Sequence, residues 1–247
     1  MIRVLDRENT IFNRFIAQMR DVNVQGDSMR FRRNLERAGE VMAYEISKTL
    51  HYTKHVVETP LGEAEVSLPD DQLVIATILR AGIPFHQGFL NYFDDAQNAF
   101  VSAYRKYSKD GSFHIKVEYI SSCELTGKTL LLVDPMLATG ASLALTYQAL
   151  LEKAGKPRRT IVATVIASEE GIEFAKKNFS MQEAEIWCGT VDAELTVKSY
   201  IVPGIGDAGN DIGFHRQFGI QMCIRDSCIT TPEKGTSRRP SWDSASC

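Results

Sequence analysis

One short run of residues limits what this chain can fold into more than any other feature. Thr129–Val133 reads Thr-Leu-Leu-Leu-Val, with no polar residue after the threonine. A strand with one face in water would alternate apolar and polar residues, so an uninterrupted run predicts a strand buried on both faces. Such strands belong to parallel sheets that carry helices on both sides. The run therefore predicts an α/β fold with a mainly parallel sheet.

Strands and helices alternate around this run, as that fold requires. Further strands are predicted at residues 73–79, 99–104, 160–167, 185–187 and 200–202, with an arm strand at residues 115–120. Apolar residues at helical spacing predict a helix from Leu143 to Ala154, which Gly155 and Pro157 end, and another over Glu169–Asn178. Strands joined through helices in this way form a sheet covered on both faces.

The first fifty residues are predicted to be helical. Apolar side chains fall on one helical face at residues 11–19 and again at residues 31–46, with a polar break at residues 23–28. Residues 56–59 and 63–68 then flank a Pro-Leu-Gly turn and predict a hairpin-like arm. The chain is therefore expected to add N-terminal helices and a β-arm to its sheet.

The last 27 residues differ in composition from the rest of the chain. Only 8 of the 27 residues in 221–247 are apolar, whereas the whole chain is 44% apolar. Serine is frequent there, and Pro232, Gly235 and Pro240 interrupt any periodicity. We therefore expect a single domain over residues 1–220 and a disordered or non-native tail over residues 221–247.

Charge and hydropathy argue against several classes of protein. Lys and Arg number 28 and Asp and Glu 31, a net charge of −3, which argues against a protein built to bind nucleic acid. No run of about eighteen apolar residues is present to span a membrane. Arg3, Asp6 and Arg7 leave no room for the apolar core of a signal peptide, so a cytoplasmic protein is expected. The five cysteines have neither C-x-x-C nor zinc-type spacing and are expected to be free thiols.

The residues that follow the buried strand carry the chemistry. Asp134 ends the strand, and Thr139-Gly140-Ala141-Ser142 then opens the predicted helix. A loop that enters a helix at the carboxyl end of a parallel strand presents free N–H groups and the positive end of the helix dipole, so it binds anions. One phosphate monoester fits this loop, and Asp134 can hold a ribose hydroxyl. The alternative is a plain strand-turn-helix in which Thr139 or Ser142 caps the helix.

Four ordered segments resemble the phosphoribosyltransferase family, and within it the uracil phosphoribosyltransferases. They are Ile78-Leu79-Arg80-Ala81-Gly82, Ala103-Tyr104-Arg105, Asp134-Pro135-Met136-Leu137-Ala138-Thr139-Gly140, and Ile201-Val202-Pro203-Gly204-Ile205-Gly206-Asp207-Ala208-Gly209. The resemblance extends from the N-terminal helices to about Gly213. It implies a phosphoribosyltransferase-type sheet, mainly parallel and flanked by helices. Ala141 departs from the family, in which glycine is common at that position, and alanine is tolerated there unless its φ is positive.

The resemblance implies that most of these residues bind 5-phosphoribosyl 1-diphosphate. Arg80 and Arg105 would grip the diphosphate, because a guanidinium can bond two oxygens at once. The resemblance also implies a cis peptide between Arg80 and Ala81. Without it, Arg80 could equally form a surface salt bridge, and Arg105 could be a solvated loop charge. The implied donor-binding residues are Arg80, Arg105, Asp134, Pro135, Met136, Leu137, Ala138, Thr139, Gly140, Ala141, Ser142 and Asp207.

The fourth segment is implied to bind uracil. Three glycines within residues 204–209 let the loop close around a small planar ligand and present backbone donors and acceptors. Uracil offers an N–H between two carbonyls, whereas cytosine reverses one partner and leaves a buried group unpaired, at a cost of about 1–3 kcal/mol. By resemblance Ile201, Gly206, Asp207 and Ala208 contact the base, and Asp207 also lies near the donor. The alternative is that Asp207 only forms a turn, but we favour binding because the loop lies at the end of a strand in an α/β sheet.

The implied reaction transfers the 5-phosphoribosyl group to uracil and forms UMP and diphosphate, a step of pyrimidine salvage. Arg80, Arg105 and Asp207 would be its catalytic residues. Mg²⁺ would be bound mainly through substrate and water, with no direct protein ligand. A homodimer or larger homo-oligomer is also implied. Two alternatives are a nucleotide-sensing, RNA-binding regulator of the same fold, against which the net charge argues, and an enzyme for another base, against which residues 204–209 argue.

Overall fold

The computed structural model describes residues 1–107, 113–179 and 184–206, apart from the side chains of residues 104–107 and 113–116. Asp207, Ala208 and the predicted tail over residues 221–247 therefore lie outside the described residues. Within the described part of the chain, no helix has the length and apolar character needed to cross a membrane.

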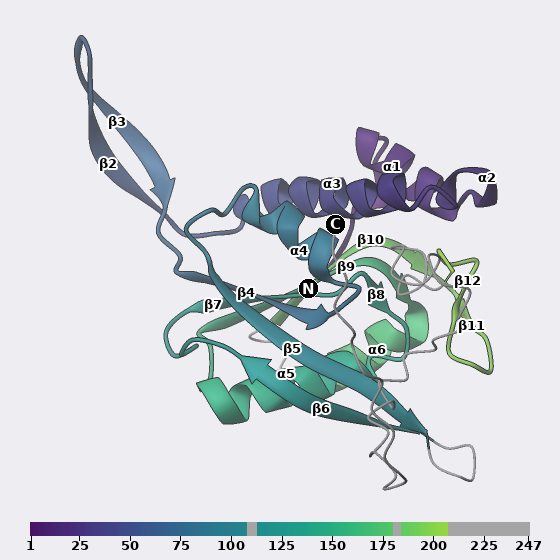
Figure 1. Ribbon diagram of the computed structural model, residues 1–247. Coiled ribbons are helices and arrows are strands. Elements are labelled where there is room, and N and C mark those ends of the chain that lie inside the picture. Colours follow the sequence, from purple (N-terminus) through teal and green to yellow (C-terminus); the bar gives the residue numbers. More distant parts are fainter. Residues whose placement is uncertain (108–112, 180–183, 207–247) are drawn as a thin grey trace, which may run out of the picture.

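A mainly parallel sheet forms the centre of the molecule, as the buried run predicted (Figure 1). Its strands, in spatial order, are β1 (Ile2–Val4), β10 (Ala184–Asp192), β9 (Arg159–Ser168), β7 (Thr129–Val133), β4 (Leu73–Leu79), β5 (Gln97–Tyr107) and β6 (Phe113–Ser121). Only β6 runs antiparallel to its neighbour, and the short β8 (Met136–Leu137) pairs with β9. Because the other strands run in one direction, their carboxyl ends share one edge of the sheet.

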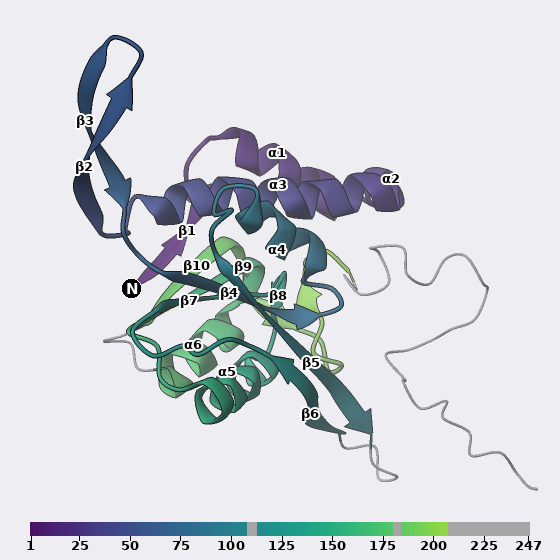
Figure 2. The same cartoon turned by 60° about the vertical axis from the view of Figure 1, so that its left-hand side comes forward.

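Helices cover both faces of the sheet (Figures 1 and 2). The N-terminal helices α1 (Ile11–Arg20), α2 (Val22–Gln25) and α3 (Ser28–Ser47) lie on one side together with α4 (Ile83–Leu90). The opposite side carries α5 (Ala141–Ala154) and α6 (Glu169–Asn178). This is the helix–sheet–helix arrangement expected for strands without a wet face.

The side chains of the central strands divide between two cores. Leu131 and Val133 of β7 pack toward the N-terminal helices. Leu130 and Leu132 point the other way, toward α5 and α6. Successive residues of a strand face opposite sides of a sheet, so both halves of this alternation must be apolar. The uninterrupted run of leucines follows from that requirement.

Two small antiparallel pairs complete the fold. The predicted arm is confirmed as β2 (Tyr52–Thr59) and β3 (Gly62–Pro69), which extend away from the body of the molecule (Figure 1). At the other end of the domain, β11 (Glu194–Leu195) pairs with β12 (Ile201–Val202). This second pair places the Gly204 segment beside the central sheet.

The prediction that the first fifty residues are all helical was wrong at the N-terminus. Ile2–Val4 forms an edge strand that pairs with β10, and a 3-10 turn (Leu5–Arg7) follows it. Three residues with a charged Arg3 at their centre carry no strand signal of their own, and the strand exists because β10 offers an unpaired edge. The helix α4 was not predicted either. Of the cysteines, Cys123 and Cys188 are free thiols as expected, and the other three lie outside the described residues.

Candidate active site

Several residues with polar or charged side chains lie at the carboxyl ends of the parallel strands. Arg80 follows β4, and Asp134 follows the neighbouring strand β7. Ser168 and Asp192 end the paired strands β9 and β10 at the same edge. Ligands of open parallel sheets bind at this edge because loops and helix N-termini meet there.

The loop before α5 is built to leave N–H groups available. Gly140 is the residue that caps α5, with φ of 78° and no side-chain hydrogen bond to the first turn. Thr139 Oγ1 accepts only a long bond from the Ala141 N–H, at 3.5 Å. The alternative in which Thr139 or Ser142 caps the helix is therefore not supported, and the first turn keeps the donors that an anion needs. Ala141 lies outside the positive-φ residues, so its methyl group is tolerated as expected.

The serine that ends the neighbouring strand β9 supports residues 138–142, which we call the phosphate loop. Ser168 is fully buried, and its Oγ donates to the Ala138 carbonyl at 2.5 Å. The same Oγ accepts from the Gly171 N–H at 2.8 Å and so caps α6. A Cβ at Gly171 would come within 2.2 Å of the Ala138 oxygen, so this glycine permits the close approach. Sequence reasoning missed Ser168, although its position directly before the predicted helix is an N-cap signal.

Asp134 lies where the ribose of a donor is expected. Its backbone N–H donates to the Ala163 carbonyl at 3.1 Å, which fixes the strand end. Burial raises the pKa of its carboxyl to about 8, and within the described residues no group donates a hydrogen bond to it. A desolvated carboxyl without a partner is a site for a ligand hydroxyl.

The segment after Asp134 lies along β9. The Ile166 N–H donates to the Pro135 carbonyl at 3.0 Å, and Met136–Leu137 continue the pairing as β8. Leu137 is 2% exposed, so its side chain is part of the core. Any contact of Leu137 with a donor would therefore come from its backbone.

The predicted diphosphate turn follows β4 directly. Arg80 is exposed, and Gly82 and Ile83 close the turn with N–H bonds to Ile78 and Arg80, each 3.2 Å long. The prediction of a cis peptide between Arg80 and Ala81 was wrong, because the cis bond lies one position earlier, between Leu79 and Arg80. β4 keeps its pairing through Leu79, opposite Ser102, so the chain turns at the first peptide after the strand.

The second predicted arginine is only partly described. The backbone of Arg105 lies in β5, opposite Ile115 of β6. Its side chain lies outside the described residues, so its role as a diphosphate ligand stays a prediction.

Two of the predicted base-binding residues, Ile201 and Gly206, are described, and they lie in β12 and in the segment that follows it. Ile201 is buried and pairs with Leu195, and Ile205 is buried three residues beyond Val202. Gly204 and Gly206 have φ of 65° and 78°, and the Val202–Pro203 bond is cis. Asp207 and Ala208 lie outside the described residues. Contacts from Arg20, Gln25 and Asp192 to this loop were not predicted, and no local pattern in the sequence signals them.

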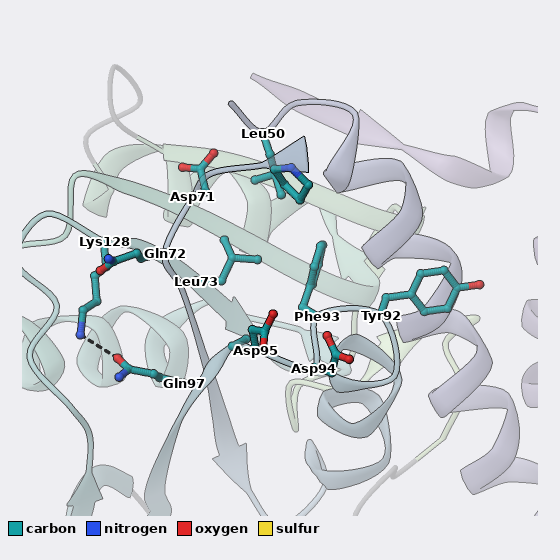
Figure 3. A pocket seen from close by; sticks show the side chains of 12 residues that line it. Leu50, Asp71, Gln72, Leu73, Tyr92, Phe93, Asp94, Asp95, Gln97 and Lys128 are labelled. Atoms are coloured by element: carbon teal, nitrogen blue, oxygen red, sulfur yellow. Dashed lines mark hydrogen bonds between the residues drawn. The ribbon is translucent and has the colours of Figure 1, made fainter. Parts of the chain in front are cut away.

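A separate hollow of about 410 Å³ lies at the opposite edge of the sheet (Figure 3). It is lined by Leu73 and Gln97, which begin β4 and β5, and by Lys128, which donates to Gln97 Oε1 at 2.6 Å. This is the amino-terminal edge of the strands, away from Arg80 and Asp134. The site is therefore assigned from the loops at the carboxyl edge rather than from this hollow.

A mainly parallel sheet whose carboxyl edge carries a strand-end aspartate and a glycine-opened helix is the arrangement expected of a phosphoribosyltransferase. The family model for uracil phosphoribosyltransferase matches residues 7–215. The chain belongs to the uracil phosphoribosyltransferase family.

Individual relatives agree with this assignment. A uracil phosphoribosyltransferase of Porphyromonas gingivalis is 53% identical over 83% of this chain and 94% of its own length. That of Pyrococcus furiosus is 41% identical over 79% of this chain and 82% of its own length. Among solved structures, the AQ2163 protein from Aquifex aeolicus is 29% identical, with a TM-score of 0.75 over 86% of this chain and 98% of that one. The family match over residues 7–215 includes all four segments on which the resemblance rested.

Proposed function

We propose that this protein is an enzyme that transfers the 5-phosphoribosyl group of 5-phosphoribosyl 1-diphosphate to N1 of uracil, forming UMP and diphosphate. The observation that carries the proposal is the N-terminus of α5, whose cap Gly140 makes no side-chain hydrogen bond, together with the carboxyl of Asp134, which has no partner among the described residues. In a member of this family, that pair supplies one anion site and one hydroxyl site, which are what a ribose 5-phosphate requires.

The donor side of the site comprises the Arg80 turn, Asp134 and the phosphate loop. The N–H groups of residues 138–142 hold the 5-phosphate, and Asp134 orients the ribose. Arg80 and Arg105 neutralise the leaving diphosphate. Bond cleavage leaves positive charge on the ribosyl ring and negative charge on the diphosphate, so the protein accelerates it by holding both ends in place and stabilising these charges.

The base side comprises the loop that begins at Ile201. Backbone groups around Gly206, Asp207 and Ala208 pair with the donor–acceptor edge of uracil. A base with one reversed partner would leave a buried backbone group unpaired, which costs about 1–3 kcal/mol and excludes cytosine. Asp207, which the resemblance assigns to both substrates, orients the base or a water bound to Mg²⁺.

The residues of this site are compatible with a Mg²⁺ ion that binds together with 5-phosphoribosyl 1-diphosphate. It takes oxygen ligands and keeps several waters, and Asp134 offers a carboxyl without a partner in the described residues. Bound to the diphosphate and the ribose hydroxyls, the ion would supply neutralising charge. Asp134 would meet it through the ribose or through water.

The remaining parts of the proposal concern the setting of the reaction. Formation of UMP from a free base places the enzyme in pyrimidine salvage, and its substrates are metabolites of the cytoplasm. We expect the enzyme to work there as a homodimer or a larger homo-oligomer. Sedimentation of the purified protein measures that state directly.

UMP formation tests the proposal. The protein is incubated with Mg²⁺ and 5-phosphoribosyl 1-diphosphate and with uracil, cytosine, orotate or hypoxanthine in parallel. Turnover with uracil alone is expected. Turnover with hypoxanthine or orotate instead would overturn the base assignment, and absence of turnover with every base would overturn the enzymatic function.

A further inference from the structure

The segment over residues 201–206, which we call the base loop, is held by a residue of the helix α1. Arg20, at the end of α1, donates from Nη1 to the Gly204 carbonyl at 3.0 Å, although the two residues are 184 positions apart. The same guanidinium donates to both carboxylate oxygens of Asp192, at 2.9 and 2.7 Å, and to Thr190 Oγ1 at 3.2 Å. A planar fork with fixed donors can satisfy all these partners at once, whereas an ammonium group cannot.

Asp192 closes this network onto the same glycine. Its Oδ2 accepts from the Gly204 N–H at 2.8 Å, so both backbone groups of Gly204 are bonded to the Arg20–Asp192 pair. The side chain of Asp192 is 6% exposed and that of Arg20 24%. Bonds shielded from water in this way restrain the backbone more firmly than surface pairs do.

A second side chain from the N-terminal helices holds the next residue. Gln25 donates from Nε2 to the Ile205 carbonyl at 2.6 Å and to the Met19 carbonyl at 2.8 Å. Gly204 and Ile205 are therefore anchored to α1 and α2 immediately before Gly206. The loop contains two left-handed glycines, which have wide conformational freedom, so these anchors determine its shape.

We propose that Arg20, Asp192 and Gln25 are positioning residues that preform the base loop and thereby set the affinity for uracil. None of them is assigned a contact with either substrate, and each acts through the backbone of Gly204 or Ile205. The proposal rests on the function proposed above. A misplacement of about 1 Å in a binding loop can cost up to about 100-fold in activity.

A matched control lies at the other end of β10, the strand that carries Asp192. Arg159 begins β9 and bonds Glu185 at 2.6 Å, the Thr49 carbonyl at 2.8 Å and Thr49 Oγ1 at 2.9 Å. Its side chain is 23% exposed, close to the value for Arg20. It therefore forms the same kind of network at the opposite edge of the sheet. Arg20→Met and Arg159→Met each remove an arginine that bonds a carboxylate and a distant carbonyl.

The experiment compares these two variants with the unmodified protein. Steady-state kinetics give KM for uracil and for 5-phosphoribosyl 1-diphosphate separately. Arg20→Met is expected to raise the uracil KM by about tenfold or more and to leave the donor KM within about twofold. Arg159→Met is expected to leave both values unchanged. Equal uracil KM values in both variants, or equal rises of both KM values in Arg20→Met, would overturn the proposal.

Hydrogen–deuterium exchange gives a readout that does not depend on activity. A peptide covering residues 201–206 is expected to exchange faster in Arg20→Met than in Arg159→Met, because Asp192, the acceptor of the Gly204 N–H, is then no longer held by Arg20. Unchanged exchange would overturn the proposal even if the unmodified protein proved inactive. Inactivity of the unmodified protein with faster exchange in Arg20→Met would overturn only the proposed function.

Gln25→Ala keeps the proposal testable if Arg20→Met does not fold. Gln25 is half-buried in a short helix, and its loss removes the Ile205 bond but leaves the Arg20–Asp192 pair in place. A rise of about threefold in the uracil KM alone is expected. A donor KM that rises to the same extent would contradict a role confined to the base side.

Discussion

The phosphate loop and the base loop are each held in place by side chains that bond to the loop backbone, but these side chains come from different parts of the chain. Both contain a left-handed glycine, Gly140 in one and Gly204 in the other. The phosphate loop is held by Ser168, which is 30 positions from the carbonyl it binds. The base loop is held by Arg20 and Gln25, which are 184 and 180 positions from theirs.

The candidate site therefore has one half that is built by neighbouring segments of the chain and another half that is built by distant ones. The phosphate loop, its strand and the helix α6 belong to consecutive crossovers of one sheet, so the unit proposed to bind the phosphate is built by a short stretch of sequence. The base loop is completed only when the two ends of the domain meet. Mutations on the donor side and on the base side should therefore separate in their effects on the two substrates.

The largest effect is expected from Arg80→Ala on the donor side. Removal of a charge that meets the leaving diphosphate should lower kcat by about 100- to 1000-fold. Arg80 is exposed, so the free energy of unfolding should change by less than about 1 kcal/mol. Kinetics and urea denaturation measure the two quantities, with Arg30→Ala on α3 as an exposed control. Unchanged kcat would remove Arg80 from the diphosphate site.

A crossed pair of glycine variants tests whether the two halves are independent. A Cβ at Gly204 would lie 2.1 Å from the Ile201 carbonyl oxygen, and one at Gly140 would lie 2.9 Å from Phe174 Cδ1. Both positions also have positive φ, so alanine must shift each loop. Gly204→Ala should raise the uracil KM by about tenfold and Gly140→Ala the donor KM by about tenfold. If each variant raised both KM values alike, the division into halves would be wrong.

Asp134→Asn sharpens the contrast between the carboxyl of Asp134, which has no partner in the described part of the chain, and that of Asp192, which is paired with Arg20. The pKa of Asp134 is raised from 3.8 to about 8, so the unfolded chain loses this proton at a lower pH than the folded protein. The free energy of unfolding therefore falls as pH rises through that window. Asparagine does not ionise, so the variant should be more stable than the unmodified protein at pH 8 by on the order of 5 kcal/mol, and the difference should disappear below about pH 4.

Denaturation curves at several pH values measure this difference. The same variant should bind 5-phosphoribosyl 1-diphosphate more weakly, because the carboxyl that meets the ribose is gone. If the difference in stability between the two proteins did not change with pH, the raised pKa of Asp134 would be contradicted. An unchanged dissociation constant for the donor would remove its ribose role.

The smallest effect is expected from Ser168→Ala. Loss of the cap on α6 should cost about 1 kcal/mol of stability. Because the Ala138 carbonyl also loses its donor, the donor KM should rise by about threefold, with the uracil KM unchanged. Thr10→Ala removes the comparable hydroxyl cap of α1 and serves as the control. If both variants gave the same donor KM, Ser168 would be a helix cap alone.

Much of the fold could be predicted because its signals are local. The bounds of β4, β7 and α6 were predicted to the residue, since each is one continuous pattern between clear breaks. The phosphate loop was predicted for the same reason. β1 could not be predicted, because three residues form a strand only where a sheet edge accepts them. The cis bond was predicted one position too late, at Arg80–Ala81 instead of Leu79–Arg80, because the motif identifies a turn and not the peptide that begins it.

The sequence by itself determined that the chain forms a helix-covered, mainly parallel sheet, and it predicted a phosphate loop after Asp134 and a resemblance to the uracil phosphoribosyltransferases. These conclusions rest on the periodicity of burial and on motifs a few residues long. Only the tertiary structure decided how the base loop is held, because its anchors, Arg20 and Gln25, lie in the N-terminal helices. A hydrogen bond between such distant residues depends on the packing of every element between them, and no local pattern encodes it.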